Sequence, residues 1–222
     1  MSLALANLSR GAFAEVIEHA LAAAALGTRP DGSLGVAALA ATYAGDLHQA
    51  RELNNRMRAV AVSPTLRAFS AYVAGEIDNA AGHRDRTEEQ YAQAIHLARS
   101  SGATFVNGIA SVGLLTVRAD AGRVHDALRG YRDVIDYFAR TGNWTHQWVT
   151  LRNLAHLLRQ LDDYDAGEQL DAAADHAPDA PAASAISSTG TARRILRQHP
   201  ALSRAHAVAV ARQAIERNLV SP

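Results

Sequence analysis

Turn residues recur along the chain at nearly constant intervals, and this period constrains the fold more than any other feature. They are Gly11, Gly45, Gly82, Gly122 and Asp162, separated by 34, 37, 40 and 40 residues. A fixed period of this length, in a chain without the alternating pattern of strands, is typical of stacked helical hairpins. We therefore expect turns near these five positions, within one repeat array over residues 1–178.

The same residue pattern follows each turn. A small or compact residue stands five positions after it, and another stands about twelve positions after it. Because two antiparallel helices approach most closely where their side chains are small, these residues mark predicted helix crossings. The first set is Val16, Ala50, Thr87, Ala127 and Gly167, and the second set is Ala23, Met57, Ala94, Val134 and Ala174.

Composition narrows the class of protein. The chain is rich in alanine, the strongest helix former, and its 22 basic residues, all arginine, balance 22 acidic ones. This balance argues against nucleic-acid binding, and the absence of cysteine excludes disulfides and thiolate metal sites. No phosphate-binding glycine loop, signal peptide or membrane-length apolar run is present. We expect a cytoplasmic protein that is not an enzyme, holds no metal or cofactor, and binds neither nucleic acid nor membranes.

The beginning of the chain does not complete a repeat. The second helix of the first hairpin spans Ala12 to Leu26, but only LALANLS precedes its turn. Leu3, Leu5 and Leu8 would then be exposed, although the end of a repeat array needs a polar face. We expect the chain to be a piece of a longer protein. The alternative is a homodimer in which the partner completes the first turn.

The end of the chain departs from the repeat. Residues 179–190 form a loop rich in proline, alanine and serine, and two capping helices are expected within residues 191–222. This tail is arginine-rich, whereas the last repeat's second helix is acidic. We therefore expect the tail to fold back as a cap, because Val208, Val210, Ala211 and Ile215 need burial. The alternative is a nucleic-acid-binding arm.

Polar and aromatic side chains on the first helix of each hairpin form the candidate site, because those helices line the concave wall of such arrays. The last repeat supplies a polar row opposite its leucines, made of Arg152, His156, Arg159 and Gln160. Equivalent positions in earlier repeats hold Phe69, Tyr72, Glu76, Asn79 and Thr116. The arginines could bind carboxylate or phosphate in two-point contacts. The alternative is a solvated helix face. An enzyme would have to use His156, which lies between two arginines.

Two tryptophans share one side of the last repeat's first helix, since Trp144 and Trp148 lie four residues apart. Aromatic side chains at that spacing are usually core residues. We expect them to anchor this repeat to the preceding one.

Two stretches carry a family resemblance. The hairpin spacing resembles the tetratricopeptide repeat. GNWTHQWVTLRNLAHLLRQLDDYDAGEQLDAAADHAPDAP and ALSRAHAVAVARQAI are similar to the C-terminal arm of LuxR/MalT-type and AfsR/SARP-type bacterial regulators, which carry a signal-transduction ATPase or an adenylate-cyclase fusion. The resemblance implies an arm that senses an inducer or partner and restrains an upstream ATPase, with no catalytic residue in this segment.

These observations predict an all-α protein. Its architecture would be a right-handed α-solenoid of tetratricopeptide-like hairpins with a C-terminal capping helix pair. Its expected function is that of a sensory or protein-interaction arm of a transcriptional regulator, which binds a peptide, protein or small inducer in its concave groove. The alternative is a stand-alone dimeric scaffold.

Overall fold

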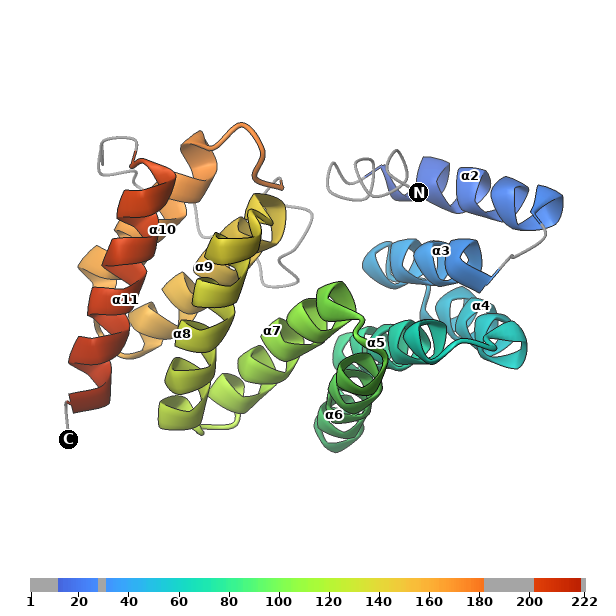
Figure 1. Cartoon of the computed structure of the whole chain (residues 1–222), viewed down its shortest axis with the longest axis horizontal. Helices are drawn as coiled ribbons and strands as arrows, with labels where there is room; N and C mark the ends of the chain where they lie inside the picture. The colour runs from blue at the N-terminus through green and yellow to red at the C-terminus, as the bar shows by residue number, and fades with distance from the viewer. Residues whose placement is uncertain (1–11, 28–30, 182–201, 221–222) are drawn as a thin grey trace. The chain divides into compact units, whose positions relative to one another are not determined.

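The computed structural model describes residues 12–27, 31–181 and 202–220, and within these ranges the chain forms helices and no strands (Figure 1). The prediction of an all-α fold is therefore confirmed. None of the described helices combines the length and apolar character that crossing a membrane requires. The described helices are α2 (Phe13–Leu26), α3 (Asp31–Tyr43), α4 (Leu47–Val60), α5 (Pro64–Ala80), α6 (Arg84–Ser101), α7 (Thr104–Asp120), α8 (Val124–Thr141), α9 (Trp144–Gln160), α10 (Tyr164–His176) and α11 (Arg204–Val220).

Tight turns separate helices at four of the five predicted positions. Gly45, Gly82 and Gly122 have φ angles of 87°, 76° and 79°, and Asp162 has a φ of 62°. This left-handed conformation suits glycine, and aspartate is one of the few other residues that adopts it. Asp162 therefore takes the same backbone conformation as the three glycines. The fifth predicted turn residue, Gly11, lies outside the described residues.

The predicted crossing residues lie in the interior. All five of the first set are buried, and in the last hairpin a Cβ added to Gly167 would stand 3.0 Å from the carbonyl oxygen of Ala155. In the second set Met57, Ala94, Val134 and Ala174 are buried, but Ala23 is exposed. The prediction for Ala23 was wrong, because α2 packs into the core through a face that includes Val16 and Ala20, and Ala23 lies outside that face.

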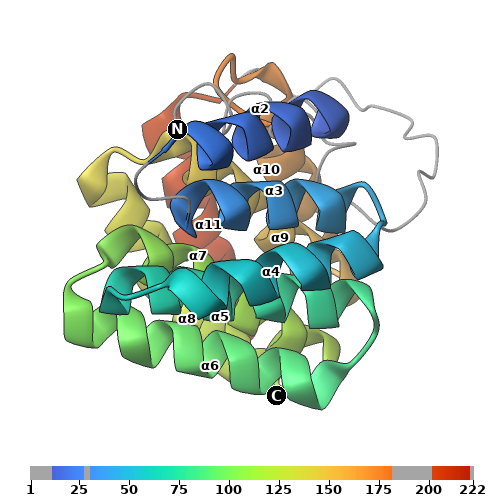
Figure 2. The same ribbon diagram turned by 90° about the vertical axis from the view of Figure 1, so that its right-hand side faces the viewer.

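The helices form two compact units, Met1–Val117 and Arg118–Pro222. In the first unit each helix from α2 to α5 packs against the next one, and α3 also packs against α5. Figure 2 shows α2, α3 and α4 running side by side. Helix α7 completes this core with Val106, Ala110, Leu114 and Val117.

In the second unit, α9 packs between α8 and α10, and α11 packs mainly against α8 and α10. The residues of α11 that become buried are Ala207, Val208, Ala211, Ala214 and Ile215, while Val210 is only partly buried. The helix thus presents a continuous apolar stripe to its neighbours. The other expected tail helix, near residues 191–198, and the leucines of the N-terminal stub lie outside the described residues.

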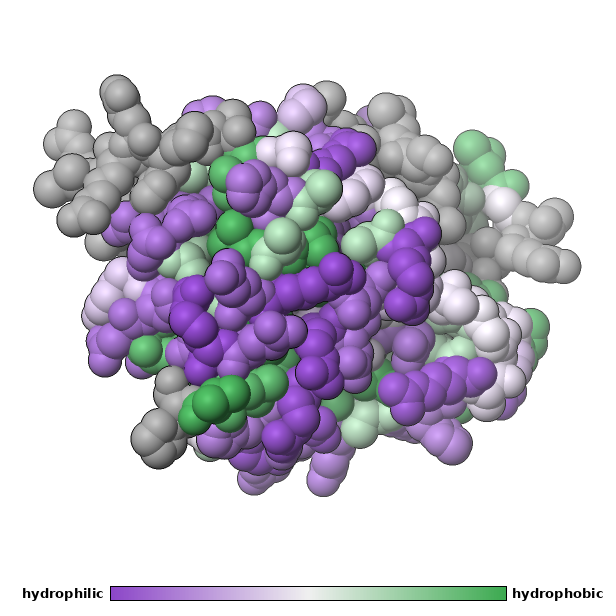
Figure 3. Space-filling view, turned by 60° about the vertical axis from the view of Figure 1, so that its left-hand side comes forward, coloured by the Kyte–Doolittle hydropathy of each residue, from purple (hydrophilic) through white to green (hydrophobic). Residues whose placement is uncertain are grey.

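Ion pairs between arginine and aspartate surround the apolar contact of α11. Arg204 pairs with Asp179 at 2.7 Å, Arg212 with Asp136 at 2.6 Å, and Arg217 with Asp163 at 2.8 Å. About half of each arginine side chain is exposed. The side of the molecule that carries α10 and α11 is accordingly largely hydrophilic (Figure 3). Exposed pairs contribute little free energy, so burial of the apolar stripe holds α11 in place.

Candidate functional site

A carboxylate bonded by tyrosine hydroxyls is the centre of the candidate site in the first unit. The hydroxyl of Tyr91 donates to Oε1 of Glu76 at 2.6 Å, and the hydroxyl of Tyr43 donates to Oε2 at 3.0 Å. The three residues come from α6, α5 and α3. The side chain of Tyr72, one turn before Glu76 on α5, belongs to the same group and acts on the carboxyl by hydrogen bonding.

Aromatic rings extend this cluster along α5. Tyr72 lies 6.3 Å from Phe69 and 6.1 Å from Tyr91, measured between ring centroids. Tyr91 fits because two glycines leave room for its ring. A Cβ added to Gly75 would stand 2.7 Å from the ring, and one added to Gly113 would stand 2.6 Å from it. The two glycines thus fix the position from which Tyr91 reaches Glu76.

Burial sets the ionisation of the cluster. It raises the pKa of Glu76 above its ordinary value of 4.5, while the hydrogen bonds from Tyr91, Tyr43 and Tyr72 oppose this shift without cancelling it. Burial also raises the pKa of each tyrosine well above 10, and the nearby Glu76 carboxylate adds to the shift. The three hydroxyls therefore stay protonated and act as donors.

The cluster reaches the surface at one edge. Tyr43 is 39% exposed, Glu76 is half-buried and Asn79 is exposed, whereas Tyr72 and Tyr91 are buried. Within the part of the chain that the structure describes, no basic side chain pairs with Glu76. A carboxylate held by neutral donors beside an accessible aromatic ring can accept a cation from outside, since both groups attract positive charge.

The structure brings some of the predicted groove residues together and separates others. Phe69, Tyr72 and Glu76 belong to one cluster, with Asn79 at its exposed end. Thr116 lies on α7 and donates its hydroxyl to the backbone carbonyl of Val112 in the same helix at 3.1 Å.

The two arginines of the predicted cationic row are engaged by their own hairpin. Arg152 pairs with Asp175 at 2.6 Å, and Arg159 pairs with Asp171, both of which lie on α10. The Arg152 side chain is only 12% exposed, and that of Asp171 is only 5% exposed. Arg152 and Arg159 therefore do not form the expected anion-binding wall. Arg152 and Arg159 turn towards α10, because burial of Asp171 requires a compensating cation.

The remainder of the row is exposed. His156 and Gln160 lie one turn apart on α9, and the Nε2 atoms of their side chains are 3.1 Å apart. An exposed histidine in contact with an amide has no described acid or nucleophile beside it. His156 and Gln160 match the alternative interpretation of the row as a solvated helix face.

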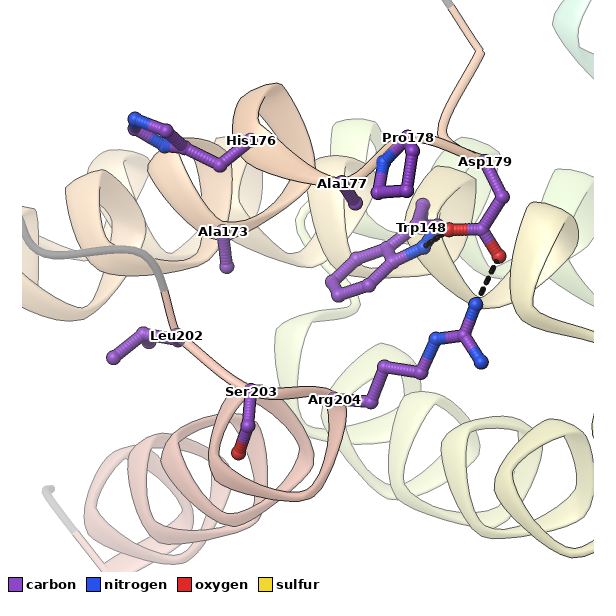
Figure 4. A pocket seen from close by; sticks show the side chains of 9 residues that line it. All are labelled: Trp148, Ala173, His176, Ala177, Pro178, Asp179, Leu202, Ser203 and Arg204. Carbon is purple, nitrogen blue, oxygen red and sulfur yellow. Dashed lines mark hydrogen bonds and ion pairs between the residues drawn. The ribbon is translucent and has the colours of Figure 1, made fainter.

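Trp148 is hydrogen-bonded to one of the residues that attach α11 (Figure 4). The indole N–H of Trp148 donates to Oδ1 of Asp179 at 3.0 Å, and Arg204 donates to the other oxygen at 2.7 Å. Arg204 also lies over the ring of Trp144, 5.0 Å from its centroid. Trp148 is buried as predicted, but its hydrogen bond belongs to the attachment of α11.

A hollow of about 220 Å³ adjoins this attachment, with Trp148, Pro178 and Leu202 among its lining residues. Figure 4 shows the Trp148 ring towards the middle of the hollow and Asp179 bridging it to Arg204. Both charged lining residues are therefore already paired with each other. The hollow offers only a small apolar surface and does not indicate a ligand.

Tyr72 and Glu76 were predicted from the sequence as site residues, whereas Tyr43 and Tyr91 were not. Tyr91 stands on the second helix of its hairpin, and Tyr43 is the last residue of its helix, so neither occupies a predicted groove position. A signal was present in Gly75 and Gly113, because glycine within a helix is destabilising unless another group needs the space.

We predict that Glu76→Gln changes the pH dependence of stability. The folded-state pKa of Glu76 is raised, so its contribution to stability is complete below the unfolded value near 4.5 and is lost as the pH rises through the folded value. Glutamine removes this loss. In urea denaturation between pH 4 and 8, the stability of Glu76→Gln relative to wild type should increase above pH 4.5. The matched change Glu89→Gln, at an exposed position on α6, should give a flat difference. If the stability difference between Glu76→Gln and wild type did not change with pH, this result would contradict the burial of Glu76.

We also predict that Arg159→Ala lowers the free energy of unfolding by about 1–3 kcal/mol, because the buried Asp171 loses a charged partner. Arg129→Ala is the control, since Arg129 and Asp126 form an exposed pair at 2.7 Å and its loss should change little. Chemical denaturation measures both variants. Equal, small effects would show that Asp171 does not depend on Arg159.

No group of three or more histidine, aspartate or glutamate side chains that could hold a metal ion occurs among the described residues. Comparisons of the chain with protein-family models, with curated proteins and with solved structures gave no match.

Proposed function

We propose that this chain is a non-catalytic binding module that recognises a partner protein through a basic side chain. The observation that carries the proposal is Glu76, a carboxylate held by two tyrosine hydroxyls at 2.6 and 3.0 Å, with no basic partner among the described residues. The partner contributes an arginine or lysine in an exposed segment. This segment lies along the exposed edge of α5 and α3, where Asn79 and Tyr43 are accessible.

The free energy of such a contact comes from the state of Glu76. Burial disfavours its charged form, and a guanidinium or ammonium group placed against the carboxylate would restore that form. The accessible ring of Tyr43 adds an attraction for the same cation. Because the tyrosines already orient the carboxylate, little conformational entropy is lost when the partner binds. An acidic or apolar side chain is attracted neither to the Glu76 carboxylate nor to the Tyr43 ring in this way, so the site selects basic segments.

The architecture that we propose around this site is a right-handed α-solenoid of tetratricopeptide-like hairpins. Packing of consecutive helices, the additional contact of α3 with α5, and small residues at the helix crossings support this architecture. In such an array the first helices of the hairpins line the concave wall. The cluster on α5 then belongs to the face where extended segments are bound in helical-repeat proteins.

Selection from a displayed peptide library against the full chain tests the binding function. We expect wild type to enrich peptides with arginine or lysine, and Glu76→Gln to weaken the selected peptides by about tenfold, the equivalent of one charge-assisted hydrogen bond. Glu89→Gln should bind like wild type. Affinity should also fall at pH values below the raised pKa of Glu76, where the carboxyl is protonated. Selected peptides without basic residues, or equal binding by Glu76→Gln, would refute the proposed site.

We further propose that the module serves as the sensory arm of a bacterial transcriptional regulator, with an ATPase on the same polypeptide. The support for this context is the resemblance of residues 142–181 and 201–215 to such arms. Partner binding would then shift an equilibrium between domains. The reading frame upstream of the Met1 codon tests this context. A continuous frame that encodes a phosphate-binding loop supports it, whereas a nearby stop codon contradicts it and leaves the binding function intact.

A further inference from the structure

A second hollow, of about 330 Å³, opens between α4, α5 and α6 in the first unit. Arg58 of α4 and Arg67 of α5 line it together with the amides Gln90 and Gln93 of α6. No acidic residue lines it. The hollow therefore presents two positive charges and two neutral polar groups.

Neither arginine has a carboxylate partner among the residues that the structure describes. Arg58 donates from Nη2 to the amide oxygen of Asn55 at 3.3 Å, and Arg67 donates from Nε to the backbone carbonyl of Ala61 at 3.3 Å. These neutral acceptors hold the two side chains without cancelling their charge. Each guanidinium has five N–H donors, so further donors remain for a ligand.

The floor of the hollow is apolar and fixed. Ala71, Ala74 and Leu97 supply apolar surface, and the buried Ser70 lies beside them. The hydroxyl of Ser70 donates to Oδ1 of Asn54 at 3.0 Å, and Nδ2 of Asn54 donates to the carbonyl of Ser70 at 3.2 Å. This pair of bonds ties α4 to α5, so the floor is formed before any ligand binds.

From these features we infer that the hollow binds a small organic oxyanion. Its phosphate or carboxylate group would lie between Arg58 and Arg67, because guanidinium donors match both oxyanions in two-point contacts. Its apolar part would cover Ala71 and Leu97, and the glutamine amides would accept or donate at the rim. A volume of about 330 Å³ suits a metabolite-sized ligand.

This site is separate from the Glu76 cluster, although both use α5. Arg67, Ser70, Ala71 and Ala74 recur at helical spacing on one face, and the cluster residues of α5 lie on the opposite face. A basic segment and a small anion can therefore bind the same unit at once. Failure of one site does not imply failure of the other.

Titration of the full chain with phenyl phosphate, followed by calorimetry, tests the inference. We expect saturable binding at one site, with inorganic phosphate weaker because it lacks the apolar part. Arg58→Gln and Arg67→Gln should each weaken binding about tenfold, the loss of a charged hydrogen bond. Benzoate, titrated in parallel, shows whether the site prefers phosphate or carboxylate, and either preference supports the inference if it depends on both arginines.

Arg56→Gln is the matched control, because Arg56 is an exposed arginine on α4 outside the lining of the hollow. Circular dichroism of each variant checks that the helices remain folded. If Arg56→Gln weakened binding equally, the binding would reflect general electrostatic attraction, and the proposed site would be wrong. Absence of saturable binding by both phenyl phosphate and benzoate would also overturn it.

Discussion

Close approach of helix backbones is the constraint on which the rest of this structure depends. At Ala50, Thr87, Ala127 and Gly167 the side chains are small or compact enough for the helices of a hairpin to touch, and all four are buried. Where small residues leave space between helices, large side chains fill it. The ring of Tyr91 occupies the room that Gly75 and Gly113 leave, and this placement brings its hydroxyl to Glu76. The chemistry of the first unit is thus a result of how tightly its helices pack.

The sequence was sufficient to predict features that depend on one helix or one turn. The turns at Gly45, Gly82 and Gly122 and the buried crossing residues follow from local periodicity. The site was only partly predictable, because it depends on how one helix is rotated against another. Periodicity put Arg152 and Arg159 on a polar face, but could not show that Asp175 and Asp171 of α10 would meet them. For the same reason Tyr43 and Tyr91 escaped prediction, since a hairpin pattern does not tell which residues at a helix end or on a second helix reach across.

Charge balance over the whole chain conceals local imbalance. The 22 basic and 22 acidic residues cancel, and in the second unit Arg152, Arg204, Arg212 and Arg217 each pair with an aspartate. The first unit contains charged groups without such a partner among the described residues. Glu76 has no described basic partner, while Arg58 and Arg67 have no described acidic partner. Glu76 and Arg67 lie on opposite faces of α5, and Arg58 lies on α4, so the two sites are the basis of separate binding proposals.

The position of the two tryptophans makes the second unit spectroscopically distinct from the first. Trp144 and Trp148 are the only tryptophans in the chain, and both contact residues that attach α11, namely Arg204 and Asp179. The first unit contains Tyr43, Tyr72 and Tyr91 instead. Tryptophan emission therefore follows the melting of residues 118–222 alone, whereas far-ultraviolet circular dichroism follows the helices of both units. The separation between the two unfolding curves is a direct measure of how independently the two halves of the chain fold.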